Sequence, residues 1–328
     1  MMTMPRRDVL AAAGVSALLP AAAWAQRPQR VWRIGWISSI NSFNEPYSLA
    51  FMQRLAEQGF VEGRNLVVER RSADGRIERL PELAADLGKQ NCDLYFSGAA
   101  EAQLVALLRA TRDTPIIIVA ADFDPVASGH VTDLARPGGR ITGITPLQAV
   151  MPAKRLELLK ELIPGARKVA VLGNTTTAAQ LAVVQEAARR MSVTLHAVEL
   201  KAAPFDYEAA FADIVRARCD ALLALASGLF VPARQKIPEL ALKARLPSMF
   251  HQAQWAEAGG LASYGFSFID MYQRAAEQAA AILRGAKAAN MPMEQGSKFE
   301  LVVNLKTARA LGLAVPASIM LRADRVIE

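Results

Sequence analysis

The sequence predicts an α/β protein with two Rossmann-like lobes, each built on a parallel sheet, joined by a multi-strand hinge. A Cys-Asp pair leads twice into an apolar run that ends in Ser-Gly, at residues 92–98 and 219–228. Each run follows a helix-like segment opened by Asp, and a short apolar run between helical segments is typical of a buried parallel strand. This pattern indicates a duplicated half, and two similar halves enclose a cleft.

In the first lobe, apolar runs alternate with segments of helical periodicity. Gly59 is placed to end the first helix, Asp74 to cap the second, and residues 137–139 form a Pro-Gly-Gly turn before the last strand. The expected strands are 31–38, 66–71, one starting at Leu94, 116–121 and 141–145, and the expected helices are 46–58, 77–88 and 103–111.

The second lobe repeats this order after a helix at 152–162, which Pro164 and Gly165 end. Asp206 is a candidate N-cap for a helix that ends near Arg218. The other expected helices are 178–191, 269–284 and 306–311, and the expected strands are 168–172, 194–200, 221–226, 247–250, 261–264 and 299–304. We expect the strand at 261–264 to pass back between the lobes and the helix at 269–284 to pack on the first lobe.

These elements divide the chain into four segments. Residues 1–25 form an export signal, 30–145 with 266–292 form lobe 1, and 146–265 form lobe 2. Residues 293–328 form a C-terminal crossover segment that the sequence assigns to neither lobe. A mature chain of about 300 residues is long enough for two domains.

The first residues carry the features of a cleaved export signal. Arg6 and Arg7 precede an uncharged stretch at 9–23, and Ala-Trp-Ala at 23–25 has the small-x-small pattern of a cleavage site near Ala25. The stretch is shorter than the roughly 20 residues that span a bilayer. Residues 6–10 also fit the twin-arginine pattern, so the route of export stays open. We expect a periplasmic protein that does not itself span the membrane.

Charge and cysteine usage exclude several classes. Without residues 1–25 the net charge falls from +7 to +6, and basic residues are interspersed with acidic ones, as in 155–161, which indicates solvated helix faces rather than a nucleic-acid surface. Cys92 and Cys219 start equivalent strands of different lobes, so we expect them to lie too far apart for a disulfide. We expect both to be small buried hydrophobes.

Several stretches of this chain resemble one family of ABC transporter substrate-binding proteins. They lie at 55–65, 79–84, 124–126, 135–143, 154–161 and 299–308, and the resemblance runs from about Arg33 to Glu328. It implies the type I periplasmic-binding-protein fold and a relation to tryptophan- and tyrosine-binding members. It also implies a small ligand that is delivered to a membrane permease. We expect a monomer without a cofactor, and no close cluster of His, Cys and carboxylate residues offers a metal site.

The candidate ligand-binding residues lie where the strands end, because ligands of open α/β sheets sit beyond the carboxyl ends of the strands. On the first lobe they are Ser38, Ser39, Asn41, Ser97, Gly98, Ala99, Asp122 and Asp124, and on the second Asn174, Thr175, Ser227, Phe230, His251 and Gln252, with Tyr264 near the crossover. Hydroxyls and helix-start N–H groups suit a carboxylate, and the aspartates suit an ammonium. Aromatic residues, namely Phe43, Tyr47, Phe230 and Tyr264, can cover an apolar side chain. An amino-acid-like ligand carries all three of these groups, namely a carboxylate, an ammonium and an apolar side chain.

Each candidate also has a purely structural interpretation. Ser and Asn at strand ends commonly cap the next helix, and Asp124-Pro125 can simply fix a turn. Phe230 and Tyr264 are equally suited to the core, and His251 to a satisfied polar position at a strand end.

Two other functions stay open at this point. An exported enzyme is one, but the chain has no catalytic motif, and His130, His196 and His251 are scattered. The other is a binding protein that serves a sensor system. We favour leucine-type or aromatic amino acids as ligand, followed by a small carboxylate or another nitrogenous solute.

Overall fold

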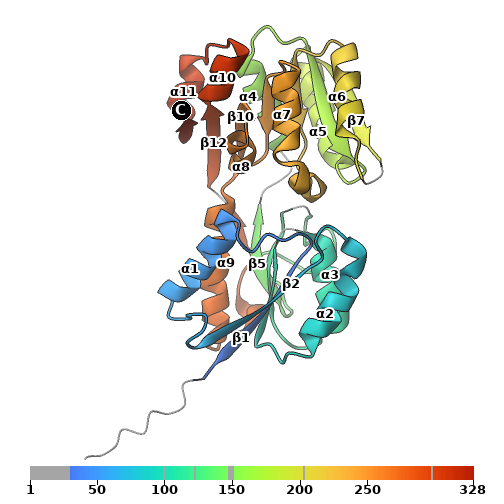
Figure 1. Ribbon diagram of the computed structural model, residues 1–328. Coiled ribbons are helices and arrows are strands. Elements are labelled where there is room, and N and C mark those ends of the chain that lie inside the picture. Colours follow the sequence, from blue (N-terminus) through green and yellow to red (C-terminus); the bar gives the residue numbers. More distant parts are fainter. Residues whose placement is uncertain (1–29, 99, 122, 147–150, 202–203, 297) are drawn as a thin grey trace, which may run out of the picture. The chain divides into compact units, whose positions relative to one another are not determined.

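The computed structural model describes residues 30–328 except 99, 122, 147–150, 202–203 and 297 (Figure 1). The predicted export signal and two candidate site residues, Ala99 and Asp122, lie outside this part of the chain. From Val31 to Glu328 the chain forms one compact unit that contains two sheets. Within the described residues, no helix is both long and apolar enough to cross a membrane.

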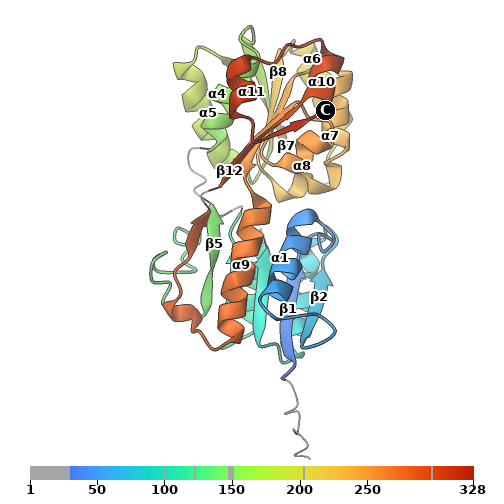
Figure 2. The same cartoon turned by 90° about the vertical axis from the view of Figure 1, so that its left-hand side faces the viewer.

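The first sheet has the strand order β2-β1-β3-β4-β5-β11, and all its neighbouring strands are parallel. Its strands are β1 (Trp32–Ser38), β2 (Leu66–Ser72), β3 (Leu94–Gly98), β4 (Ile116–Val119), β5 (Ile141–Pro146) and β11 (Glu294–Gly296). One face is covered by α1 (Pro46–Glu57) and α9 (Phe268–Leu283), which lie side by side in Figure 2. The other face is covered by α2 (Leu80–Gly88) and α3 (Glu101–Ala110).

The second sheet repeats this order as β7-β6-β8-β9-β10 and adds β12 and β13 at its edge. Only the β10–β12 pair is antiparallel. The strands are β6 (Lys168–Asn174), β7 (Thr194–Leu200), β8 (Ala221–Ala224), β9 (Ser248–Phe250), β10 (Ala262–Phe266), β12 (Phe299–Asn304) and β13 (Arg325–Ile327). The helices are α4 (Met151–Leu162), α5 (Ala178–Arg190), α6 (Tyr207–Arg216), α7 (Lys236–Lys243), α8 (Ala253–Glu257), α10 (Leu305–Leu311) and α11 (Ala317–Arg322).

The repeated Cys-Asp pair has the same place in both lobes. Asp93 precedes β3 and accepts a hydrogen bond of 2.8 Å from the backbone N–H of Arg33, at the start of β1. Asp220 precedes β8 and accepts from the backbone N–H groups of Arg167 and Lys168, at the start of β6. These backbone donors lower the pKa of the Asp220 carboxyl. Each aspartate therefore ties the third strand of its lobe to the first strand.

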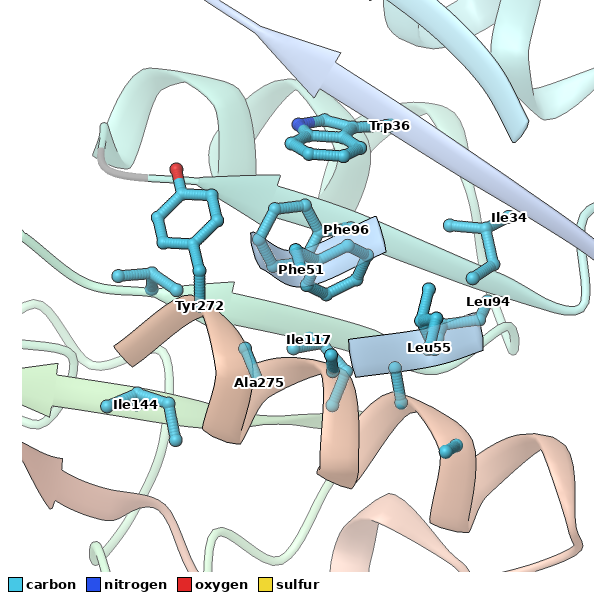
Figure 3. Close-up of a cluster of buried hydrophobic side chains, with 14 of the residues drawn as sticks. Ile34, Trp36, Phe51, Leu55, Leu94, Phe96, Ile117, Ile144, Tyr272 and Ala275 are labelled. Atoms are coloured by element: carbon cyan, nitrogen blue, oxygen red, sulfur yellow. The ribbon is translucent and has the colours of Figure 1, made fainter. Parts of the chain in front are cut away.

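The first lobe is held together by an aromatic cluster between its sheet and the α1–α9 pair (Figure 3). Trp36 on β1 contacts Phe96 on β3 edge to face, with ring centroids 4.9 Å apart, and Phe51 on α1 at 5.2 Å. Such pairs contribute about 0.5–1.5 kcal/mol each beyond the area they bury. Tyr272 on α9 closes the cluster, and burial raises the pKa of its hydroxyl well above the ordinary value.

The chain passes between the two sheets three times, after β5, after β10 and after β11. The C-terminal segment is divided accordingly, since β11 pairs with the first sheet while β12 and β13 extend the second. The predicted helix at 269–284 is α9, and it packs on the first sheet as expected.

Two expectations about local structure are settled. Asp74 does not cap a helix, because it adopts φ +51° in a turn with Ser72, and a short 3₁₀ helix, Ile77–Arg79, precedes α2 instead. Cys92 and Cys219 are both free thiols, as predicted. Cys92 is buried, whereas Cys219 is only half-buried.

Candidate functional site

Each sheet reverses its strand order beside its first strand, between β1 and β3 and between β6 and β8. Loops diverge at such a switch point and leave room for a ligand beyond the carboxyl edge of the sheet, meaning the edge where the parallel strands end. The predicted residues at these two places come together in pairs.

In the first lobe, a buried glutamine joins the two strand ends. Gln103 on α3 donates a 3.0 Å hydrogen bond to Oγ of Ser39, just beyond β1, and accepts one of 3.4 Å from Ser97 on β3. Ser38 and Ser42 also share a hydrogen bond of 3.0 Å. Gln103 could not be selected from the sequence, because it is the third residue of an ordinary amphipathic helix.

Gly98 occupies a position where a side chain has no room. A Cβ built on Gly98 would lie 2.3 Å from the hydroxyl oxygen of Tyr272. The N-cap residue of the following helix is Ala100, which provides no side-chain cap, so the first N–H groups of α3 receive no side-chain acceptor from it. Gly98 and α3 thus present backbone rather than side chains at this edge.

In the second lobe, Asn174 and Ser227 are hydrogen-bonded to each other. Nδ2 of Asn174 donates to Oγ of Ser227 over 2.7 Å, and Oδ1 accepts from the backbone and hydroxyl of Thr176. Ser227 also accepts from the N–H of Leu229 and caps the 3₁₀ helix Gly228–Ala233. The polar atoms of both side chains are therefore largely satisfied inside the lobe. Thr175 and Asn41 are exposed.

The structure corrects the expectation for Phe230. This ring has no exposed surface and packs against Phe205 and Tyr207 in the core of the second lobe, because the 3₁₀ helix turns it inward. Asp124 is exposed, and its Oδ1 accepts from the N–H groups of Val126 and Ala127, so it fixes a turn.

The remaining aromatic candidates are half-buried. Tyr264 on β10 stacks on Phe299, with ring centroids 5.9 Å apart. Phe43 contacts Trp36 at 5.5 Å, and Tyr47 contacts Tyr272 at 4.8 Å. All three residues are partly buried and pack against the cores of the lobes.

His251 follows β9 and is 8% exposed. Among the described residues, its Nδ1 is buried without a hydrogen-bond partner. Burial, together with the neighbouring cation of Arg155, lowers the pKa of the imidazole to about 3. His251 is therefore neutral at physiological pH, and the sequence-based expectation of a satisfied polar residue is wrong for its Nδ1.

Arg155 is the main residue that sequence reasoning missed. Its acidic neighbours along the chain suggested a solvated face, but the side chain is 5% exposed. The helical spacing of Arg155 could have indicated that it is buried. Residues on the same side of α4 are buried as well, namely Met151, Leu158, Leu159 and Leu162. The pair that does face solvent is Lys154–Glu157.

Among the described residues, an ion pair joins the two lobes. Arg234, beyond the 3₁₀ helix of the second lobe, donates to both carboxylate oxygens of Glu45, the residue before α1, over 2.8 and 3.1 Å. The two side chains are 28% and 19% exposed. The loops at the carboxyl edges of the two sheets are therefore in direct contact.

Two further features bear on the kind of site. Within the described residues, no group of His, Cys, Asp and Glu is arranged to hold a metal ion. A hollow of about 90 Å³ lies between β6, β7 and α5, with Asn174 and Leu181 in its lining. It is smaller than the roughly 300–1,000 Å³ of ordinary ligand pockets.

The two doubly wound sheets define the type I periplasmic-binding fold. The chain belongs to the family of ABC transporter substrate binding proteins, whose sequence pattern matches residues 47–327. This is a family of binding components rather than enzymes.

Three relatives are similar over most of the chain. A tyrosine-binding protein of Clostridioides difficile (strain R20291) is 24% identical over 266 residues, which cover 80% of this chain and 75% of the relative. The solved structure of a conserved domain protein from Vibrio cholerae superposes with a TM-score of 0.80 at 24% identity and covers 90% of this chain and 100% of that one. An ABC domain from Streptococcus pneumonia in complex with L-Trp has a TM-score of 0.79 at 23% identity, with the same coverage. These structures share the fold.

Proposed function

We propose that this protein is the periplasmic solute-binding component of an ABC importer and captures a small amino-acid-like ligand between its lobes by hinged closure. The observation that carries the proposal is the pairing of polar residues at both switch points, Ser39 and Ser97 through Gln103 in one lobe and Asn174 with Ser227 in the other. Ligands of open α/β sheets occupy this position.

Closure is supported by the way the chain connects the lobes. Three passes between two separate sheets permit a hinge, because a few residues at element ends absorb the change in backbone angles. The pair of Arg234 and Glu45 offers a contact that holds the edges together. A ligand that touches both lobes favours the closed state through its higher affinity for that state.

Aromatic amino acids are the favoured ligands, ahead of leucine-type amino acids and small carboxylates or other nitrogenous solutes. Two relatives support this order, since one is named as tyrosine-binding and the other was solved with L-Trp. The half-buried rings of Phe43, Tyr47 and Tyr264 suit an aromatic side chain.

Export to the periplasm rests on the signal-like residues 1–25. Expression of the full chain in a Gram-negative host should give a periplasmic protein that starts near Gln26. N-terminal sequencing of that fraction tests this part, and a cytoplasmic, uncleaved chain contradicts it.

A thermal-shift screen of the chain from Gln26 onward tests the ligand class. The panel contains amino acids, small carboxylates, sugars and nucleosides at about 1 mM. A ligand at a thousand times its dissociation constant adds about 4 kcal/mol to the free energy of unfolding, which moves the midpoint by several degrees. We expect shifts confined to amino acids, and a shift confined to sugars or nucleosides contradicts the proposed ligand class.

A further inference from the structure

Arg155 is a buried cation without a carboxylate partner among the described residues. The side chain is 5% exposed, and its one hydrogen bond runs from Nε to the backbone carbonyl of Tyr264 over 2.7 Å. Within the part of the chain that the structure describes, neither Nη1 nor Nη2 has an acceptor, and no carboxylate lies within salt-bridge distance. The two terminal nitrogens of this side chain therefore have no protein acceptor among the described residues.

A buried charge of this kind is unfavourable unless something compensates it. The free-energy cost of moving a guanidinium out of water is offset only by an opposite charge or by acceptors that bind its N–H donors. Desolvation lowers the pKa of Arg155 to about 10, which still leaves the side chain charged at physiological pH. Among the described residues, no carboxylate compensates this charge, and an anion at the terminal nitrogens would do so.

Arg155 lies at the edge of the second sheet where the other candidate residues are. The residue lies near the start of α4, which packs against β9 and β10. A Cβ built on Gly265 would lie 3.7 Å from Nη2 of Arg155 and 1.9 Å from the carbonyl oxygen of His251, so these groups meet where β9 and β10 end. This is the carboxyl edge of the second sheet, where Asn174 and Ser227 also lie.

The neighbour of Arg155 adds a second unused polar group. Nδ1 of His251 is buried without a partner among the described residues. A neutral imidazole can donate one hydrogen bond. Because it is uncharged, it does not repel the cation of Arg155. One guanidinium and one neutral imidazole together suit a group with a single negative charge and two acceptor oxygens.

We propose that Arg155 binds the carboxylate of the ligand through its terminal nitrogens, with Nδ1 of His251 as a supporting donor. A planar guanidinium matches a carboxylate in a two-bond geometry, which selects carboxylates over neutral solutes. This inference deepens the proposed function and rests on it, because it names the chemical group that the amino-acid-like ligand must carry.

Arg155 also has a possible structural role, because it holds the carbonyl of Tyr264. Arg140 is a matched control for that role. It is a half-buried arginine whose guanidinium donates to the carbonyls of Leu108, Thr111 and Thr114 and to the hydroxyl of Thr111, at the end of α3. Both terminal nitrogens of Arg140 therefore donate to protein acceptors, whereas those of Arg155 do not.

Four proteins separate the two roles: the wild type, Arg155→Met, Arg155→Lys and Arg140→Met. We expect Arg155→Met to keep or raise the thermal midpoint of the ligand-free protein, since it removes an uncompensated buried charge. The same variant should bind carboxylate ligands at least about 30-fold more weakly, and Arg155→Lys should recover part of that loss. Arg140→Met should lower the midpoint by about 3 °C or more and leave affinity unchanged.

The probes for calorimetric titration are three amino acids, L-tryptophan, L-tyrosine and L-leucine, and two analogues of each. One analogue lacks the amino group, and the other lacks the carboxylate, as tryptamine and tyramine do. We expect wild-type binding of the amino acid and of the acid without its amino group, but not of the amine.

Three outcomes overturn the inference. If an amine binds as tightly as its amino acid, the protein does not recognise the carboxylate. If Arg155→Met binds with an affinity within about threefold of the wild type, Arg155 does not bind the ligand. The inference is also overturned if the wild type binds no carboxylate. In that case, a midpoint shift with another class of solute would still support the proposal that the protein binds a solute.

Discussion

Arg234 and Glu45 are 189 positions apart in the sequence, yet the guanidinium donates to both carboxylate oxygens over 2.8 and 3.1 Å. The hydrogen bonds that Arg234 donates to Glu45 are the main cause that raises the pKa of Arg234. Because each residue belongs to a different lobe, the pair stabilises the arrangement in which the two carboxyl edges are close. In the proposed mechanism, this is the ligand-bound arrangement.

Glu45→Gln should therefore weaken ligand binding. Partly exposed ion pairs contribute about 0.5–1 kcal/mol, so we expect a two- to five-fold loss of affinity in titrations at low salt. Glu277→Gln is the control, because it breaks a pair with Arg54 between α1 and α9 of one lobe. Equal affinity of Glu45→Gln and the wild type would show that the pair does not stabilise the bound state.

Gly98→Ala should destabilise the first lobe, since the new methyl group would lie 2.3 Å from the hydroxyl oxygen of Tyr272. Overpacking of this kind costs about 1–3 kcal/mol. Tyr272→Phe removes that oxygen, so the double variant should recover part of the loss in a urea-unfolding double-mutant cycle. Purely additive effects of the two changes would argue against this contact.

The stability of the protein should fall on acidification because of His251. The unfolded chain binds a proton with an ordinary pKa of about 6.5, whereas the folded imidazole does so only near a pKa of about 3. The contribution is fully present above pH 6.5 and is lost towards pH 3, at up to about 1.4 kcal/mol per pH unit.

Urea unfolding at pH 7 and pH 5 measures this dependence. His251→Gln should reduce the loss of unfolding free energy between these two pH values. His196→Gln is the control, because His196 is 28% exposed and hydrogen-bonded to Asp213. An undiminished pH dependence in His251→Gln would assign the effect to other groups.

Both thiols should be present and slow to react in the native protein. Burial raises the pKa of Cys92 to about 11 and also raises that of Cys219, so little thiolate forms at neutral pH. Titration with a thiol reagent in denaturant, without reductant, should find two thiols per chain. A count that rises only after reduction would reveal a disulfide.

The parts of the fold that could be predicted are those with a local physical cause. Asp206 caps α6 by accepting from the N–H of Ala209 over 2.9 Å, as its position before an amphipathic run indicated. The repeated Cys-Asp pair correctly marked two equivalent strands, because the aspartate ties β3 or β8 to the first strand of its lobe. By contrast, β11 and β13 are short and only partly buried, so no apolar run marks them as strands.

For the candidate residues, the sequence indicated their place in the fold more reliably than their contacts. The switch-point topology brought Asn174 and Ser227 together, but their hydrogen bonds are made within the lobe. Phe230 follows a strand like the other candidates, and only the three-dimensional packing places it in the core. Arg155 was overlooked because sequence neighbours such as Glu157 lie on another face of α4.

The most direct test of the central claim is calorimetric titration of L-tyrosine and L-tryptophan into ligand-free protein that starts at Gln26. We predict saturable binding at one site per chain for at least one of the two, with a negative heat-capacity change from the buried ring. Binding of neither, together with saturable binding of a sugar or nucleoside, would contradict an amino-acid-like ligand.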